Sequence, residues 1–169
     1  MKKPFTLFAV LLTALLTACG WQFKNSERFP EELRTLRYES ADQYSDMSRI
    51  LRNQLLLNDI TLVPQENNNH IATLRLNSAE STSRVASVFK QAREAEKILS
   101  LTVKATVSVP EKGDYPLEVS VFRTFFDDSR AALAKSEEQE SIMKQMYEQA
   151  SRQLLIKMVG LHKELSNTK

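Results

Sequence analysis

Residues 99–110 read LSLTVKATVSVP, and apolar and polar side chains alternate through the whole stretch. This period of two indicates a β-strand with one buried face, because an α-helix would scatter the apolar side chains around its axis. The buried row is Leu99, Leu101, Val103, Ala105, Val107 and Val109. Residues 90–93 separate this strand from another strand-like segment that begins near residue 83. A half-buried sheet is therefore the core of the predicted fold.

The sequence after this strand predicts a hairpin. Glu-Lys-Gly-Asp at residues 111–114 is typical of a turn, and residues 115–126 return as a strand with their odd-numbered apolar side chains on the buried face. Arg123 falls in the same row, so it is either an ion-pair partner near the end of the sheet or the sign of a register change. Asp127 and Asp128 follow and are expected to cap a turn or a helix.

The amino-terminal part of the domain predicts a strand, a helix and a second strand. Residues 33–40 form the first strand, and Ser45 can cap a helix over residues 46–58. A short apolar run at residues 60–63 follows, and residues 71–79 alternate as the next strand. The first strand–helix–strand unit can pair in parallel through a right-handed crossover.

The last predicted element is a long amphipathic helix. Ser136 followed by Gln139 has the spacing of a capping box, which places the helix start near residue 136. Its apolar stripe is Met143, Tyr147, Ala150, Leu154, Met158, Leu161 and Leu165. The predicted order is strand, helix, strand, strand, strand, helix. The fold class is therefore α+β, with two helices packed on one face of a four-stranded, mostly antiparallel mixed sheet.

The first 18 residues have the three parts of a secretory signal. Lys2 and Lys3 precede an apolar stretch at residues 5–16, which is shorter than the roughly 18 to 20 residues of a transmembrane helix. Leu-Thr-Ala-Cys ends the segment at Cys19, the only cysteine. This pattern resembles the lipobox of bacterial lipoproteins, in which the thiol receives diacylglycerol and the new amino terminus is acylated.

We therefore expect cleavage after residue 18, a single periplasmic domain over residues 19–169 with a short amino-terminal linker, and a lipid anchor at Cys19. The alternative is a secreted protein with one free cysteine. Gly20 follows the cysteine, in place of the aspartate that retains many enteric lipoproteins in the inner membrane. The expected location is thus the outer membrane of a Gram-negative bacterium, facing the periplasm.

Composition narrows the classes of function. The chain has 23 basic and 21 acidic residues, and without Lys2 and Lys3 the mature part is formally neutral. Neutrality argues against a nucleic-acid partner, and three glycines leave no glycine-rich phosphate loop. His70 and His162 are expected to be exposed structural residues, because neither belongs to a metal-ligand or nucleophile motif. We expect no enzyme, no metal and no cofactor beyond the covalent lipid.

Basic and apolar residues are interleaved near residues 84–93. The mixture suits a ligand with phosphates and acyl chains, whereas the alternative is an ordinary solvated loop. The basic residues are Arg84, Lys90 and Arg93, with Lys135 near the start of the last helix. We expect Lys90 and Lys135 to be solvent-exposed. The other face of the sheet is rich in Thr, Ser and Asn, which is typical of a water-facing sheet and equally of a surface inside a polar lumen.

Several stretches match one family in order along the mature chain. They are Cys19-Gly20-Trp21, Ser48-Arg49, residues 51–55 with Asn58, Ala86-Ser87-Val88-Phe89, Ala95-Glu96, Tyr115-Pro116, residues 121–127, Ala132-Leu133-Ala134-Lys135, Gln139-Glu140 and Met146-Tyr147. Together they resemble the LptE family of lipopolysaccharide-assembly lipoproteins.

The resemblance implies a non-enzymatic protein that plugs the β-barrel LptD, assists its assembly and contacts lipopolysaccharide. Lys90 and Lys135 match positions that the family uses for lipopolysaccharide contact, and Arg93 is a further candidate from its place beside them. A free periplasmic lipid carrier or chaperone-type lipoprotein is the alternative, and it would need an enclosed apolar pocket of several hundred cubic ångströms. A lipase or amidase on the same anchor finds no motif in the sequence.

Overall fold

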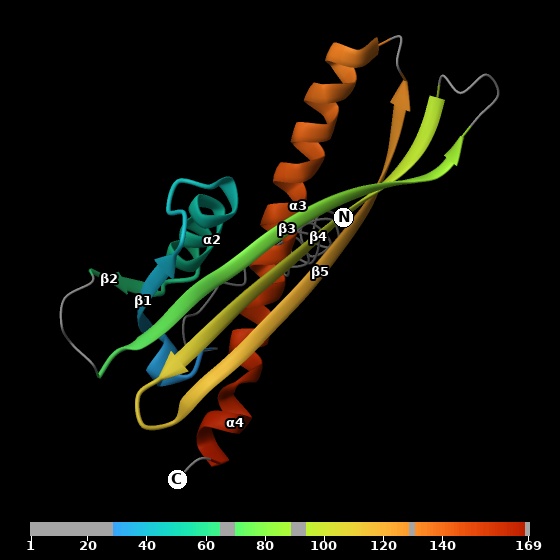
Figure 1. Ribbon diagram of the computed structural model, residues 1–169. Helices are drawn as coiled ribbons and strands as arrows, with labels where there is room; N and C mark the ends of the chain where they lie inside the picture. The colour runs from blue at the N-terminus through green and yellow to red at the C-terminus, as the bar shows by residue number, and fades with distance from the viewer. Residues whose placement is uncertain (1–28, 65–69, 89–93, 129–130, 168–169) are drawn as a thin grey trace, which may run out of the picture.

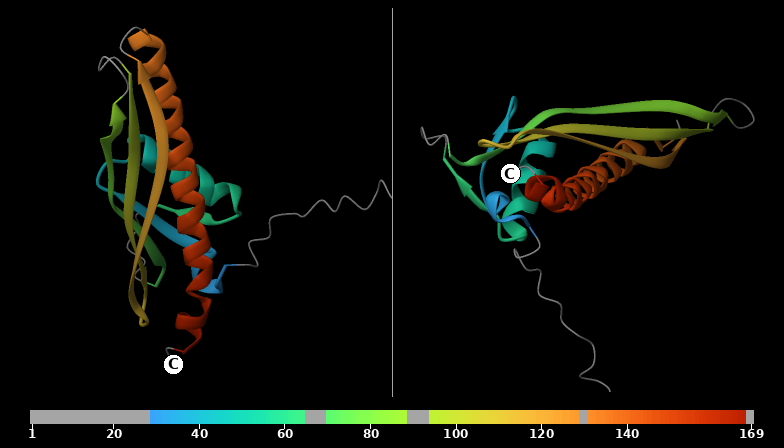
Figure 2. Two further views of the ribbon diagram at one scale, coloured as in Figure 1. Left: turned by 90° about the vertical axis from the view of Figure 1, so that its right-hand side faces the viewer. Right: turned by 90° about the horizontal axis from the view of Figure 1, so that it is seen from below.

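One mixed sheet with both long helices on the same face makes up the described part of the molecule (Figures 1 and 2). The computed structural model describes residues 29–64, 70–88, 94–128 and 131–167. Its strands are β1 (Thr35–Ser40), β2 (Thr61–Val63), β3 (Ala72–Val88), β4 (Glu94–Val109) and β5 (Gly113–Asp128). Its helices are the 3-10 turn η2 (Glu31–Leu33), α2 (Asp46–Leu57), α3 (Ala132–Gly160) and α4 (His162–Asn167). The α+β prediction is confirmed.

The sheet has the order β2-β1-β3-β4-β5. Strand β1 pairs in parallel with β3, as the strand–helix–strand unit predicted, and also with β2, whereas β3, β4 and β5 are antiparallel. All six apolar residues of the predicted β4 row are buried, with at most 5% of their surface exposed. The turn from β4 to β5 places Glu111 and Gly113 at positive φ, which suits the glycine.

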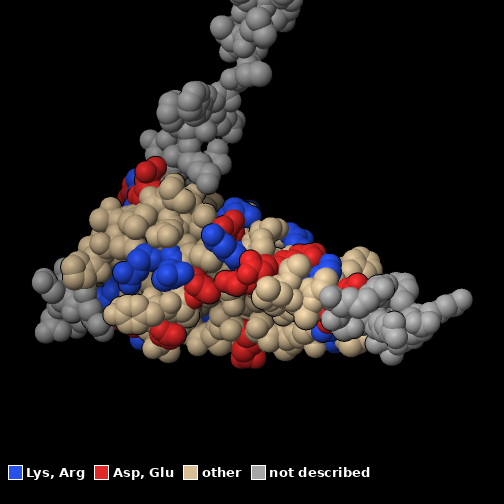
Figure 3. Space-filling model, turned by 90° about the horizontal axis from the view of Figure 1, so that it is seen from above, with Lys and Arg blue, Asp and Glu red and all other residues tan. Residues whose placement is uncertain are grey.

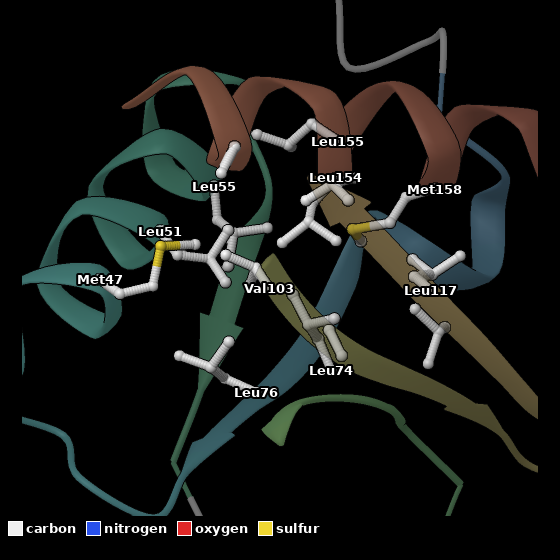
Figure 4. Packing of buried hydrophobic residues seen from close by; sticks show 14 of the residues in the cluster. Met47, Leu51, Leu55, Leu74, Leu76, Val103, Leu117, Leu154, Leu155 and Met158 are labelled. Carbon is white, nitrogen blue, oxygen red and sulfur yellow. The ribbon is translucent and has the colours of Figure 1, made fainter. Parts of the chain in front are cut away.

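The core lies between the sheet and the two helices (Figure 4). Ser45 caps α2 as predicted, because its hydroxyl accepts a hydrogen bond from the Ser48 backbone N–H at 3.3 Å. The buried face of α2 then meets that of α3 above the sheet. The side chains labelled there are Met47, Leu51 and Leu55 from α2, Leu154, Leu155 and Met158 from α3, and Leu74, Leu76, Val103 and Leu117 from the sheet.

The sheet has five strands, so the prediction of four was wrong. The apolar run at residues 60–63 contributes β2, which pairs with β1 in the register Thr35 to Thr61. The Thr61 backbone N–H also donates to the Arg34 carbonyl at 2.8 Å. Three residues are too few to show a period of two, and it is backbone pairing with β1 that makes the run a strand.

Strand β3 is one continuous strand, although its sequence alternates in two separate blocks. Register shifts between Leu76 and Ser78 and between Val85 and Ser87 explain the break. An extra residue at a bulge reverses which face the following side chains take, so the alternation restarts with opposite phase. After the first bulge Ala79 pairs with buried Val103, and thus lies on the helix side of the sheet.

Helix α3 begins earlier than predicted and ends earlier. It starts at Ala132 after Ala131, without a side-chain cap, and Ser136 lies inside it with its hydroxyl donating to the Leu133 carbonyl at 2.8 Å. Strong helix formers at residues 132–135 extend the helix past the capping-box signal. At the other end Leu161 separates α3 from the short α4. None of the described helices is long and apolar enough to cross a membrane.

Candidate functional site: the hairpin end and the outer face of the sheet

The long strands extend past α2 and end beside the start of α3 (Figure 1). We call this part of the molecule the hairpin end, and define it as residues 84–88 of β3, 94–98 of β4, 122–128 of β5 and 131–138. It contains most of the large apolar side chains that are more than half exposed in the described chain. These side chains are Val85, Val88, Phe122, Phe126 and Leu133. The other exposed ones, outside the hairpin end, are Tyr44, Leu56, Leu57 and Ile156.

Lys135, one of the three predicted contact residues, lies at the hairpin end but is not freely exposed. Its side chain is 25% exposed, and its Nζ is 2.8 Å from Glu138 Oε2. The same Nζ lies 5.6 Å from the centre of the buried Phe125 ring, within cation–π range. The expectation of a solvated lysine was therefore wrong. The other two predicted residues, Lys90 and Arg93, lie outside the described residues.

A second lysine at this end was missed by the sequence reading. Lys97 of β4 stands opposite Phe125 of β5 in the sheet register. Its Nζ lies 2.5 Å from Asp127 Oδ2, and the side chains of the two residues are 30% and 34% exposed. Asp127 is thus an ion-pair partner within β5, not the cap of a turn. The sequence could have placed Lys97 on the helix side of the sheet, because Lys97 continues the odd-numbered row that begins at Leu99.

Arg123 takes neither of its two predicted roles. The register of β4 and β5 runs without a shift through the Leu99–Arg123 pair. The Arg123 guanidinium donates a hydrogen bond to Gln149 Oε1 of α3 at 2.5 Å, so it joins the sheet to the helix through an amide. The side chain is exposed, although its sheet partner Leu99 and the next residue of its row, Phe125, are both buried.

The outer face of the sheet, which points away from the helices, carries many short polar side chains, together with charged ones such as Lys104 and Glu118. Their hydroxyl and amide groups bond to each other across the strands. The pairs are Thr82 with Ser100 at 3.1 Å, Thr102 with Ser120 at 3.2 Å, and Asn77 with Thr106 at 2.8 Å. The register extends this outer row into the hairpin end, where exposed Phe122 and Phe126 stand on either side of Thr124. The outer face is therefore polar over most of its length and apolar at one end.

Figure 3, which shows the molecule from above, has Lys and Arg gathered in one group beside a band of Asp and Glu, with further basic residues scattered along the surface. Within the described residues no group of histidine, cysteine, aspartate and glutamate side chains could hold a metal ion. Both His70 and His162 are exposed, as expected.

Two surface hollows in the described part of the molecule bear on the lipid-carrier alternative, which would need an enclosed apolar pocket. One, of about 1320 Å³, lies between α2 and α3, and its lining includes Arg49, Arg52, Glu137, Glu140 and Lys144. The other, of about 460 Å³, lies beside the ends of β1 and the first part of β3. Polar and charged side chains dominate the larger lining, unlike that of a typical acyl-chain pocket.

Comparison with known proteins places this fold in a family. The family model described as LptE, lipopolysaccharide-assembly, matches residues 33–158. The chain belongs to the LptE family. The matched range includes all five strands, α2 and most of α3, so the hairpin end and the outer face both lie inside the LptE region.

Individual relatives agree with this assignment. The chain is 37% identical over 160 residues to the LPS-assembly lipoprotein LptE of Pectobacterium atrosepticum, a match that covers 95% of this chain and 87% of the relative. It is 40% identical over 161 residues to that of Yersinia pestis, covering 95% and 76%. The crystal structure of rare lipoprotein B from Shewanella oneidensis superimposes with a TM-score of 0.71 at 31% identity, covering 78% of this chain and 98% of that one.

Proposed function

We propose that this chain is a non-enzymatic component of the lipopolysaccharide assembly machinery at the outer membrane, where it plugs the LptD β-barrel and assists its assembly. The observation that carries the proposal is the family match over residues 33–158, together with relatives that are named LPS-assembly lipoproteins. The outer face, with Phe122 and Phe126 at its apolar end, supplies a surface for the barrel, and the helix side of the hairpin end supplies one for lipopolysaccharide.

The outer face supports contact with the barrel lumen. Barrel interiors are polar and can be filled by protein, and the hydroxyl pairs of β3, β4 and β5 present a fixed polar surface. Because these hydroxyls already bond to one another, covering them leaves few polar groups without a partner. A stable complex generally buries more than about 1,200 Å² in total, and the long strands offer a broad surface for it.

The lipid anchor is the second part of the proposal. Cys19 carries S-diacylglycerol and an N-acyl chain, and several acyl chains hold a protein at a membrane far more firmly than one. Residues 20–28 separate Cys19 from the first described residue, Phe29. Nine residues span at most about 32 Å when fully extended. The anchor therefore keeps the folded domain close to the membrane and within reach of a barrel embedded in it.

The hairpin end is the proposed contact for lipopolysaccharide. Lys90, Arg93 and Lys135 supply cations for its phosphate groups, and exposed Val85 and Leu133 supply apolar surface for its acyl chains. The Lys90→Glu, Lys135→Glu double variant should weaken lipopolysaccharide binding, measured with purified protein at two salt concentrations. Because Lys135 is half-buried in an ion pair, a loss of thermal stability should accompany its replacement. Unchanged affinity would remove these residues from the contact.

Affinity purification of the tagged protein from detergent-solubilised outer membranes tests the plug directly. We expect a β-barrel of large mass to co-purify in equimolar amount. Recovery of an isolated monomer would favour the free lipid carrier, for which the two hollows described above offer little support, because charged side chains line the larger one.

A further inference from the structure

Two lysines from different elements are neighbours of one buried aromatic residue. Lys97 stands beside Phe125 in the β4–β5 register, and side chains paired in this way lie on the same face within contact distance. Lys135 approaches the same ring from α3, with its Nζ 5.6 Å from the ring centre. Phe125 itself is 2% exposed and is held in the core. The two lysines therefore flank the same buried side chain at the hairpin end.

Each ammonium group is neutralised by a carboxylate of the same chain. Asp127 holds Lys97 at 2.5 Å, and Glu138 holds Lys135 at 2.8 Å. The cluster of two lysines and two carboxylates therefore has no formal net charge. All four side chains keep a quarter to a half of their surface in contact with solvent, so a ligand can reach them.

We propose that Lys97 is a second phosphate-binding cation beside Lys135, and that Asp127 and Glu138 occupy the two ammonium groups until a phosphorylated lipid displaces them. The inference rests on the proposed function, since it takes the lipid to be the phosphorylated glycolipid handled there. A phosphate monoester carries roughly −1.5 to −2 charges near pH 7 and three acceptor oxygens, against −1 and two oxygens for a carboxylate. The exchange is therefore favourable for phosphate and unfavourable for an uncharged ligand.

Masking by carboxylates also gives selectivity. An unpaired lysine attracts any anion, whereas a paired lysine releases its partner only to a ligand of higher charge that also gains contacts elsewhere. The exposed apolar side chains Val85 and Leu133 are at the same end of the molecule and can supply such contacts. A phosphorylated lipid satisfies both requirements, and free inorganic phosphate satisfies only the first.

The test compares binding of the full-length protein, purified in detergent, to bisphosphorylated lipid A, dephosphorylated lipid A and inorganic phosphate. The Lys97→Gln variant should bind bisphosphorylated lipid A about fivefold more weakly, the equivalent of one partly exposed ion pair. Its matched control is Lys104→Gln, an exposed lysine on the outer face of the same strand, which should bind as the wild type does. Thermal unfolding of both variants checks that the fold is kept.

Affinity for the lipid should rise when a carboxylate that pairs with one of the two lysines is removed. Glu138→Gln should tighten binding of bisphosphorylated lipid A by a similar factor, whereas Glu140→Gln, an exposed glutamate of the same helix outside the hairpin end with the same change of charge, should not. Inorganic phosphate at millimolar concentration should compete poorly. If Lys97→Gln matches Lys104→Gln, or Glu138→Gln matches Glu140→Gln, the inference is overturned. If the wild type binds bisphosphorylated and dephosphorylated lipid A equally, the proposed contact between the cations and lipopolysaccharide phosphates is itself refuted. That result is distinguishable from a failure of the Lys97 inference alone, in which only the variants match their controls.

Discussion

Replacing Phe122 and Phe126 by threonine should detach the outer face from its barrel partner while leaving the fold intact. The two rings are 60% and 56% exposed, and full burial of a phenylalanine is worth up to about 3 kcal/mol. Covering the exposed part of each ring therefore contributes roughly 1–2 kcal/mol, which for the pair amounts to about 30-fold or more in affinity. Threonine suits a strand and matches neighbouring Thr124, so the free energy of unfolding should fall by less than about 1 kcal/mol.

The assay is the amount of barrel recovered with the tagged protein from detergent-solubilised outer membranes, together with thermal unfolding of the purified variants. A matched control is Leu57→Ala with Ile156→Ala, which removes two equally exposed apolar side chains from the helical side. We expect the phenylalanine variant to lose the barrel and the control to keep it. The reverse result would show that the helical surface faces the lumen wall, and would refute the placement of the outer face.

Three further outcomes test other parts of the structure. Cys19→Ala should abolish acylation and release a folded, soluble protein, and mass spectrometry of the wild-type amino terminus decides the point, since an unmodified Cys19 would contradict the anchor. Leu101→Ala should lower the free energy of unfolding by about 2–5 kcal/mol in a urea titration, because the side chain is fully buried in β4. Lys112→Met should cost about 1 kcal/mol or less at pH 7, since the Lys112 ammonium donates to Glu32 Oε1 at 2.7 Å and to the Leu165 carbonyl at 2.8 Å. The Lys112 hydrogen bond lowers the pKa of Glu32 below its ordinary value. The Lys112–Glu32 pair therefore stabilises the fold above the ordinary pKa of glutamate, and this stabilisation is lost as the pH falls through the lowered pKa. The cost of Lys112→Met should thus shrink at pH 3.

The elements that the sequence predicted well are those whose pattern is local. The β4 row alternates without interruption because one of its faces is buried from end to end, and Ser45 caps α2 through a neighbour three residues away. Strand β2 and the bulges of β3 are different, because each depends on a partner strand. A single extra residue at a bulge reverses the alternation, and only the pairing with β4 shows that the strand continues.

The same distinction applies to the candidate site. The Lys135–Glu138 pair is spaced i, i+3 on one helix, and was within reach of the sequence once the helix start was placed correctly. The Lys97–Asp127 pair joins residues on two strands, and its geometry follows from the hairpin register. The approach of Lys135 to Phe125, the sheet neighbour of Lys97, needs α3 to be packed against β5, which no local pattern encodes.

Site-specific photo-crosslinking in cells tests most directly the claim that this protein is held inside a β-barrel. Crosslinkers at Thr102 and Thr106 project from the outer face, whereas controls at Val103 and Val107 on the same strand are fully buried beneath the helices. Our account predicts covalent adducts to one outer-membrane barrel from the two threonine positions and none from the two valine positions. An absence of barrel adducts at both threonine positions, with the protein folded and at the outer membrane, would contradict it.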